Sequence, residues 1–230
     1  MKFTKLFALG GALVAFVLAP CGAALAAGGA TVTARIEGRS RTLLVPTPVR
    51  THSGWITMNH APRGACPATS AAGALDSVTR HRWSGPFSTS FDDYLITSIL
   101  GDRESGKAYY WGIWIDNKYA TTGACEIKLH RGDRLLFAVD SVADHEHPIA
   151  LTAPSRVAAG HTFSVKVVWV SDSGGEKPLS GATVTASGIS AVTNGHGVAR
   201  ITATHAGALV LRAARSGYIR AATVRVRVSG

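Results

Sequence analysis

Apolar and polar residues alternate along much of this chain, and the alternation predicts β-strands. The stretch 31–37 (TVTARIE) alternates strictly, as expected of a strand with its apolar side chains turned inward. The stretch 42–49 is also extended, but Pro46 and Pro48 cannot donate hydrogen bonds to a neighbouring strand. We therefore predict an opening hairpin whose second strand lies at the edge of a sheet.

The densest group of aromatic residues lies at 109–115 (YYWGIWI), which has the composition of a strand. Asp116 and Asn117 follow it, and both residue types tolerate the positive φ of a tight turn. The stretch 134–139 is apolar again and follows the turn residues 130–133. The pattern predicts further strands of the same sheet, with the chain doubling back after the aromatic run.

One segment has the spacing of a helix rather than of a strand. Residues 69–81 (TSAAGALDSVTRH) can be capped by Thr69 or Ser70. The side chains on their apolar face are mostly small, which suits a helix laid across a sheet. These residues are Ala71, Ala74, Leu75 and Val78. A strand is predicted at 91–100, so the order of elements indicates an α+β layer arrangement.

The second part of the chain has a different pattern. From residue 149 onward seven short alternating runs recur, with turns between them and no helical spacing: IALTAP, HTFSVKVVWV, ATVTAS, ISAVTN, GVARITAT, ALVLRAA and ATVRVRV. This pattern predicts an all-β sandwich. We place the domains at 27–146 and 147–230.

The first 26 residues have the pattern of an export signal. A basic start is followed by an apolar run at 6–18 and by small residues at 24–26, which predicts cleavage near Ala26. Lipid attachment at Cys21 is an alternative, although Pro20 fits that processing poorly. We expect a secreted or cell-surface protein with no transmembrane span in the mature chain.

Removal of this signal leaves two cysteines, Cys66 and Cys125. In an exported chain an even pair of cysteines is expected to form a disulfide. A free reactive thiol or a metal ligand is the alternative, but neither cysteine has the neighbouring cysteine or paired histidine that a zinc site needs.

The net charge of +10 lies mostly in the second part of the chain. Residues 27–149 carry 13 basic and 12 acidic side chains, whereas residues 150–230 carry nine basic and two acidic. In an exported protein the expected acidic partners are envelope polymers or lipid headgroups, and nucleic acid is not expected. The candidate basic surface comprises Arg212, Arg220, Arg225 and Arg227. An ordinary solvated face is the default interpretation, protection of a sheet edge also explains these residues, and adhesion to an anionic wall polymer is the functional alternative.

The first domain resembles a known family. The segments TVTARIEG, SAAGALD, DDYLITSILG and YYWGIWIDNKYATTGACEIKLHRGDRLLF, within 31–140, resemble the bacterial family of unknown function named after the transcobalamin C-terminal domain. This resemblance implies an α+β β-grasp fold and a flat ligand such as a corrinoid or another tetrapyrrole. Asp116-Asn117-Lys118 departs from the family's usual Asn-Gly turn. Residues 150–229 resemble immunoglobulin-like and carboxypeptidase-regulatory-like modules, which serve as spacers or adhesive units.

The aromatic strand is the candidate ligand site. Tyr110, Gly112 and Trp114 share one face of the predicted strand, and the helix can cover only the other. Either loops close this face, or it is a platform on which a planar ligand stacks beside Tyr119 and Trp55. No cofactor is expected apart from a tetrapyrrole ligand.

Two other motifs suggest chemistry that we do not expect. Residues 172–175 (DSGG) resemble part of a serine-protease nucleophile loop, but Ser171 stands where a glycine should and no histidine has a matching context. His145 and His147 could ligate a metal from one side of an extended chain, but a polar interdomain linker explains them without a metal, and we favour that interpretation. We therefore expect neither a metal nor an enzyme.

Two functions remain. The first is an exported binding protein whose aromatic strand binds a small ligand or a partner, with the basic sandwich as a spacer. The second is a structural or adhesive envelope protein whose modules bind other proteins or anionic wall polymers. If the first is correct, Trp114→Ala should abolish ligand binding and leave the melting temperature nearly unchanged.

Overall fold

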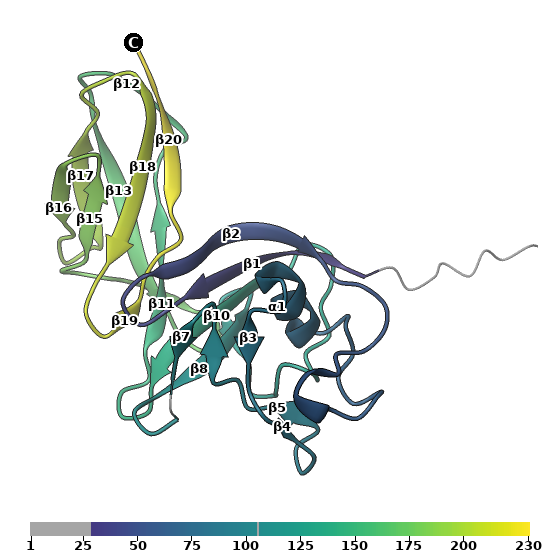
Figure 1. The fold of residues 1–230 in the computed structure, drawn as a ribbon. Coiled ribbons are helices and arrows are strands. Elements are labelled where there is room, and N and C mark those ends of the chain that lie inside the picture. The colour runs from purple at the N-terminus through teal and green to yellow at the C-terminus, as the bar shows by residue number, and fades with distance from the viewer. Residues whose placement is uncertain (1–28, 105) are drawn as a thin grey trace, which may run out of the picture.

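The chain folds into two β-rich modules, which meet across one face of a sheet (Figure 1). The computed structural model describes residues 29–104 and 106–230. The predicted signal, with Ala26 and Cys21, lies outside the described residues. Strands account for 48% of the structure and helix for 6%.

The main sheet of the first module has five strands in the order β2-β1-β10-β8-β9. β1 and β10 are parallel, and the other neighbours are antiparallel. The strands are β1 (Thr31–Glu37), β2 (Thr42–Arg50), β8 (Tyr109–Ile115), β9 (Lys118–Tyr119) and β10 (Arg134–Ser141). The predicted strands at 31–37, 42–49, 109–115 and 134–139 are confirmed.

Local chemistry sets the boundaries of this sheet. β2, which contains Pro46 and Pro48, is the edge strand that the sequence predicts. Asp116 and Asn117 join β8 to β9 with φ values of 49° and 66°, in the left-handed region that a tight hairpin turn requires.

The predicted helix is present as α1 (Ala71–Thr79). Ser70 caps it, since its Oγ accepts a hydrogen bond from the Gly73 amide at 3.3 Å. Arg80 ends the helix in a left-handed conformation with a φ of 53°. One 3₁₀ turn, η1 (Met58–His60), lies in the loop that precedes α1.

The single strand predicted at 91–100 is wrong. Only β5 (Asp93–Tyr94) and β6 (Ser98–Ile99) form there. Asp92 and Leu100 take positive φ, and the buried Asp93 carboxylate accepts the Cys125 amide at 2.8 Å, so the backbone turns instead of remaining extended. The companion short strands are β3 (Trp83–Ser84), β4 (Phe87–Ser88) and β7 (Asp102–Arg103).

The α+β β-grasp fold expected for the first domain is also wrong. α1 has only nine residues, and the chain around it folds into short strands in two small additional sheets. Strand therefore dominates this module as well, and the structure as a whole fits an all-β arrangement. The small apolar side chains of α1 suit a helix packed on a sheet, but they do not determine how the neighbouring segments pair.

The core of the first module lies between the main sheet and α1. Inward-facing residues of three strands, including Ile36, Trp111 and Phe137, pack with Leu75 of the helix. The predicted disulfide is confirmed, because Cys66 and Cys125 are bonded with an S–S distance of 2.04 Å. It fastens the loop before α1 to the segment between β9 and β10.

The second module is the predicted sandwich. One sheet has the order β14-β13-β11-β19 with β17 paired to β13, and the other has the order β12-β20-β18-β15-β16. The strands are β11 (His147–Thr152), β12 (Arg156–Ala158), β13 (Thr162–Val170), β14 (Glu176–Pro178), β15 (Thr183–Ala186), β16 (Ile189–Val192), β17 (Val198–Thr202), β18 (Gly207–Ala214), β19 (Tyr218–Ile219) and β20 (Val224–Ser229). All seven predicted runs form strands.

Alternation along these strands supplies the sandwich core. Val165, Val184, Ile201, Leu211 and Val226 are among the buried residues that the two sheets contribute. In the described part of the chain, no helix has the length and apolar character that a membrane span requires.

Removal of the disulfide should destabilise the first module. The bond closes a loop with a sequence separation of 59, and the chain-entropy model assigns such a loop roughly 4 kcal/mol of stabilisation. We expect Cys66→Ala/Cys125→Ala to lower the free energy of unfolding by about that amount, as measured by urea denaturation. Reduction of the wild-type chain should cause a matching loss, and a loss below about 1 kcal/mol in both would contradict a stabilising disulfide.

Candidate functional site at the junction of the two modules

The main sheet of the first module has a second face, which the sandwich covers. Side chains alternate along β8, so Trp111 and Ile113 point to the α1 side while Trp114 points to the other. Trp114 packs with Leu136 and Ala138 of β10 and with Ile219 of the sandwich. This junction is therefore a small hydrophobic core shared by the two modules.

Trp114 is fully buried, so a flat ligand cannot stack on it. Its ring lies across Gly112, where a Cβ atom would come within 2.6 Å of Trp114 Cη2. The ring of Trp114 itself thus fills the space above Gly112. The indole Nε1 is buried without a hydrogen-bond partner in the described structure, which is consistent with an apolar packing role.

The other predicted ligand residues are separated. Tyr110 and Tyr119 are half-buried at the junction, and Tyr119 packs edge-on against Trp114 at 5.1 Å between ring centroids. Trp55 lies on the loop before α1 and is 46% exposed. The structure brings four of the five residues together as an interdomain joint, not as an open platform, and leaves Trp55 elsewhere.

At one side of this joint a buried carboxylate links the modules. Glu37 of β1 is buried and pairs with Arg35 at 3.0 Å and with Arg220 of the sandwich at 3.2 Å. Arg220 also donates to the backbone carbonyls of Gly38 and Arg39. Burial lowers the pKa of Arg35, although the negative charge of Glu37 opposes the shift.

On the same face of the sheet, a polar network surrounds Asp140 of β10, which pairs with Tyr110 of β8. Asp140 is fully buried and accepts hydrogen bonds from the amides of Ser141 and Glu146 and from the hydroxyl of Tyr110. His145 Nδ1 lies 2.5 Å from Asp140 Oδ2. Burial, together with hydrogen bonds to Tyr119 and Asp140, raises the pKa of Tyr110.

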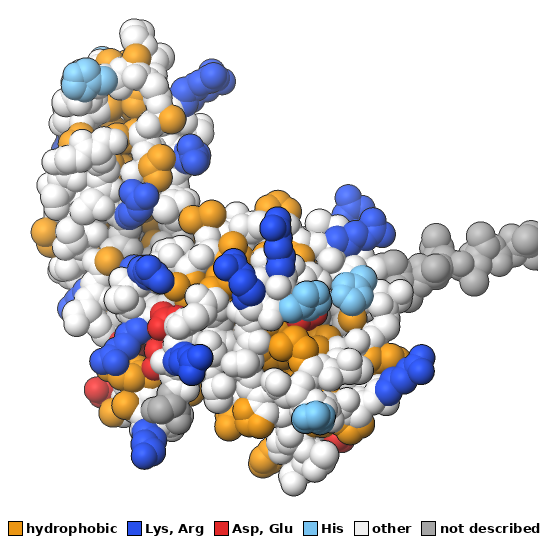
Figure 2. Space-filling model, viewed as in Figure 1, with side chains coloured by type: hydrophobic (Ala, Val, Ile, Leu, Met, Phe, Trp, Pro, Cys, Tyr) orange, Lys and Arg blue, Asp and Glu red, His pale blue; other side chains and the backbone are white. Residues whose placement is uncertain are grey.

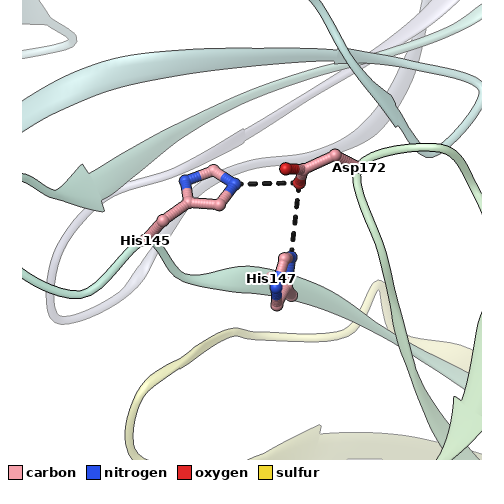
Figure 3. A group of neighbouring side chains, drawn as sticks. All are labelled: His145, His147 and Asp172. Atoms are coloured by element: carbon pink, nitrogen blue, oxygen red, sulfur yellow. Dashed lines mark hydrogen bonds and ion pairs between the residues drawn. The ribbon is translucent and has the colours of Figure 1, made fainter.

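His145, His147 and Asp172 form a compact cluster in the same region (Figure 3). His145 Nε2 lies 2.9 Å from Asp172 Oδ1, and His147 Nδ1 lies 3.4 Å from the same oxygen. Burial lowers the pKa of His145, but hydrogen bonds to Asp172 and Asp140 and the charges of both carboxylates outweigh it, so the net pKa is raised. Two imidazoles and one carboxylate are a donor set that can hold a divalent metal.

Sequence reasoning found two members of this cluster and missed the third. The spacing of His145 and His147 indicates possible ligands, whereas Asp172 stands out in the sequence only as part of a protease-like motif. Asp172 lies in the turn between β13 and β14, and its carbonyl accepts a hydrogen bond from the Tyr119 amide at 2.9 Å. No local pattern indicates this pairing, because the sandwich must dock before the turn reaches the link.

A cavity of about 440 Å³ also opens between the modules. Three arginines line it, Arg39 of the first module and Arg215 and Arg220 of the sandwich. Arg39 stacks on Tyr109 at 3.9 Å, and Arg215 lies above Tyr218 at 5.4 Å. Guanidinium groups held in this way are oriented for carboxylate or phosphate groups.

The predicted basic surface is divided by the fold. Arg212, Arg225 and Arg227 are exposed on the outer face of the β12-β20-β18 sheet, while Arg220 is committed to Glu37 at the junction. Arg156 of β12 joins the exposed three, since it lies beside Arg227 in register. We call Arg156, Arg212, Arg225 and Arg227 the arginine face.

Comparison with known proteins finds a similarity to one family model over part of the chain. Residues 74–141 match the family model described as Domain of unknown function (DUF4430). The matched segment runs from α1 to the end of β10 and supports the expected resemblance to a family of unknown function; it carries no link to transcobalamin. No curated protein matches the chain.

The burial of Trp114 reverses the effect expected for its replacement. Because the ring fills the shared core, Trp114→Ala should lower the free energy of unfolding by about 4 kcal/mol. Trp55→Ala is the matched control and should cost less than about 1 kcal/mol, since Trp55 is 46% exposed. Equal losses in urea denaturation would show that Trp114 is not a core residue.

Replacement of Glu37 tests the ionic side of the junction. Glu37→Gln leaves Arg35 and Arg220 without their shared counter-charge and should cost about 3 kcal/mol of unfolding free energy. The same substitution at the exposed Glu176 should change stability by less than about 0.5 kcal/mol. Thermal and chemical denaturation of the two variants side by side would measure this difference, and similar values would refute the linkage.

Proposed function

We propose that this protein is an exported, non-enzymatic envelope protein whose sandwich adheres to an anionic polymer and holds the first module in a fixed orientation. Export rests on the pattern of the first 26 residues. The small-ligand alternative depended on an open aromatic platform, and Trp114 occupies that position with its own packing. The adhesive alternative is therefore the stronger of the two.

The arginine face is the observation that carries this proposal. Arg225 and Arg227 alternate with the buried Val226 and Val228, so both project from the same side of β20. Arg156 lies directly beside Arg227 on the neighbouring strand. Like charges in adjacent positions of a sheet oppose folding, and a bound polyanion would relieve that repulsion.

The distribution of acidic residues leaves this face unneutralised. Residues 150–230 contain two acidic side chains, Asp172 and Glu176, and both lie around the turn between β13 and β14. Figure 2 shows basic side chains spread along the visible side of the sandwich and acidic ones only in the lower part of the view. A flexible anionic chain with repeated phosphate or carboxylate groups fits such an extended positive surface.

The junction supports the second half of the proposal. An apolar core around Trp114, the ion pairs of Glu37 and the hydrogen bonds of Asp140 connect the two modules at different points of one sheet face. Three separate sets of contacts restrict bending and rotation between the modules. An anchored sandwich would therefore present the first module in a defined direction.

Binding to immobilised poly(glycerol phosphate) tests the function. Residues 27–230 should be retained at low salt and released as the ionic strength rises, because salt screens exposed charges. A quadruple Arg→Gln variant of the arginine face should bind about tenfold more weakly or worse. The control is an equal quadruple change at exposed arginines of the first module, Arg50, Arg63, Arg103 and Arg131, and should bind within about twofold of wild type. Equal weakening by both sets would show binding by net charge alone and overturn the proposed surface.

A further inference from the structure

We propose that His145, His147 and Asp172 bind one divalent transition-metal ion of the zinc type, which fastens the interdomain link to the sandwich. The three donor atoms are His145 Nε2, His147 Nδ1 and Asp172 Oδ1. This site lies at the junction, away from the arginine face, and does not depend on polymer binding.

The distances between these donors suit a single ion. Asp172 Oδ1 lies 2.9 Å from His145 Nε2 and 3.4 Å from His147 Nδ1, and all three donor atoms lie within 4.8 Å of one another. A tetrahedral ion with bonds of roughly 2.05 Å needs donors about 3.3 Å apart. The present separations therefore differ from that spacing by no more than about 1.5 Å.

His145 already has the support that a metal-binding histidine needs. Its Nδ1 donates to the buried Asp140, so Nε2 is the nitrogen directed at the cluster. Three further donors hold Asp140 in place, the amides of Ser141 and Glu146 and the hydroxyl of Tyr110. A carboxylate behind a ligating histidine orients the ring and increases its basicity.

His147 provides an independent indication. Its Nδ1 is buried and makes no hydrogen bond in the described structure, although it lies only 3.4 Å from Asp172 Oδ1. The ring is held by stacking on Trp169 at 4.9 Å between centroids. A buried nitrogen without a hydrogen bond is costly, and coordination to a cation would satisfy it.

The donor set favours zinc and related ions over calcium or magnesium. Two imidazole nitrogens and one carboxylate oxygen suit zinc, copper or nickel, whereas calcium and magnesium prefer oxygen ligands only. Asp172 is 52% exposed, so the ion could be reached from solvent and a water molecule could take a fourth position.

The position of the cluster gives the ion a structural role. His145 lies in the link between the modules and is bonded to Asp140 of the first-module sheet, while Asp172 belongs to a turn of the sandwich (Figure 3). An ion shared by these residues would connect the sheet of one module to the turn of the other.

Zinc titration by calorimetry tests the site. Residues 27–230, produced without a histidine tag and treated with chelator, should bind one equivalent of Zn²⁺ and melt at a higher temperature with zinc than without it. Asp172→Asn and His147→Ala should each weaken binding at least about tenfold and lose the zinc-dependent rise in melting temperature. His161→Ala is the control, since His161 is exposed and outside the cluster, and should behave as wild type.

Nitrogen-15 NMR of the histidine rings distinguishes this geometry from adventitious binding. Zinc should shift the Nε2 resonance of His145 but the Nδ1 resonance of His147, because the two rings use different nitrogens. Circular dichroism without zinc should show that both cluster variants are folded. Absence of stoichiometric binding, unchanged affinity in the folded variants, or shifts at other histidines only would each overturn the proposal.

Discussion

The rest of the structure depends on the burial of the second face of the first-module sheet beneath the sandwich. A sheet whose two faces both carry aromatic and aliphatic residues must be covered twice, and α1 with its loops covers only one side. The sandwich supplies the second cover through Ile219, which closes over Trp114. Dispersion contacts and the removal of apolar surface from water therefore hold the modules together, so neither face is left open.

Polar groups beside this apolar contact restrict its orientation. Glu37 pairs with Arg220, and Asp140 holds His145 beside Asp172. Desolvated charges are costly unless their partners are correctly placed, so these pairs favour one docking orientation over its alternatives. The same requirement brings two histidines and an aspartate close enough for a metal, while the arginines of the outer sheet remain in solvent.

Much of the local structure follows from the sequence. Alternation in 31–37 and throughout the second module determines which side chains turn inward, since successive residues of a strand point to opposite faces. Ser70 before a run of small residues starts α1, and Asp116-Asn117 turns the chain after β8. The pairing of Cys66 with Cys125 follows because they are the two cysteines left after the predicted signal. These features depend on residues close in sequence or on the presumed oxidising compartment.

Only the tertiary structure decided what covers the aromatic face and which partners the charged residues have. Alternation placed Trp114 on the face opposite α1, but its burial required Ile219, which lies more than a hundred residues away. Likewise, the pattern indicated His145 and His147 as candidate ligands, but only the docked turn brought Asp172 to them and assigned Arg220 to Glu37. Local sequence thus determined the direction in which each side chain points, whereas long-range docking determined what it meets, because no local pattern encodes the partner that another module supplies.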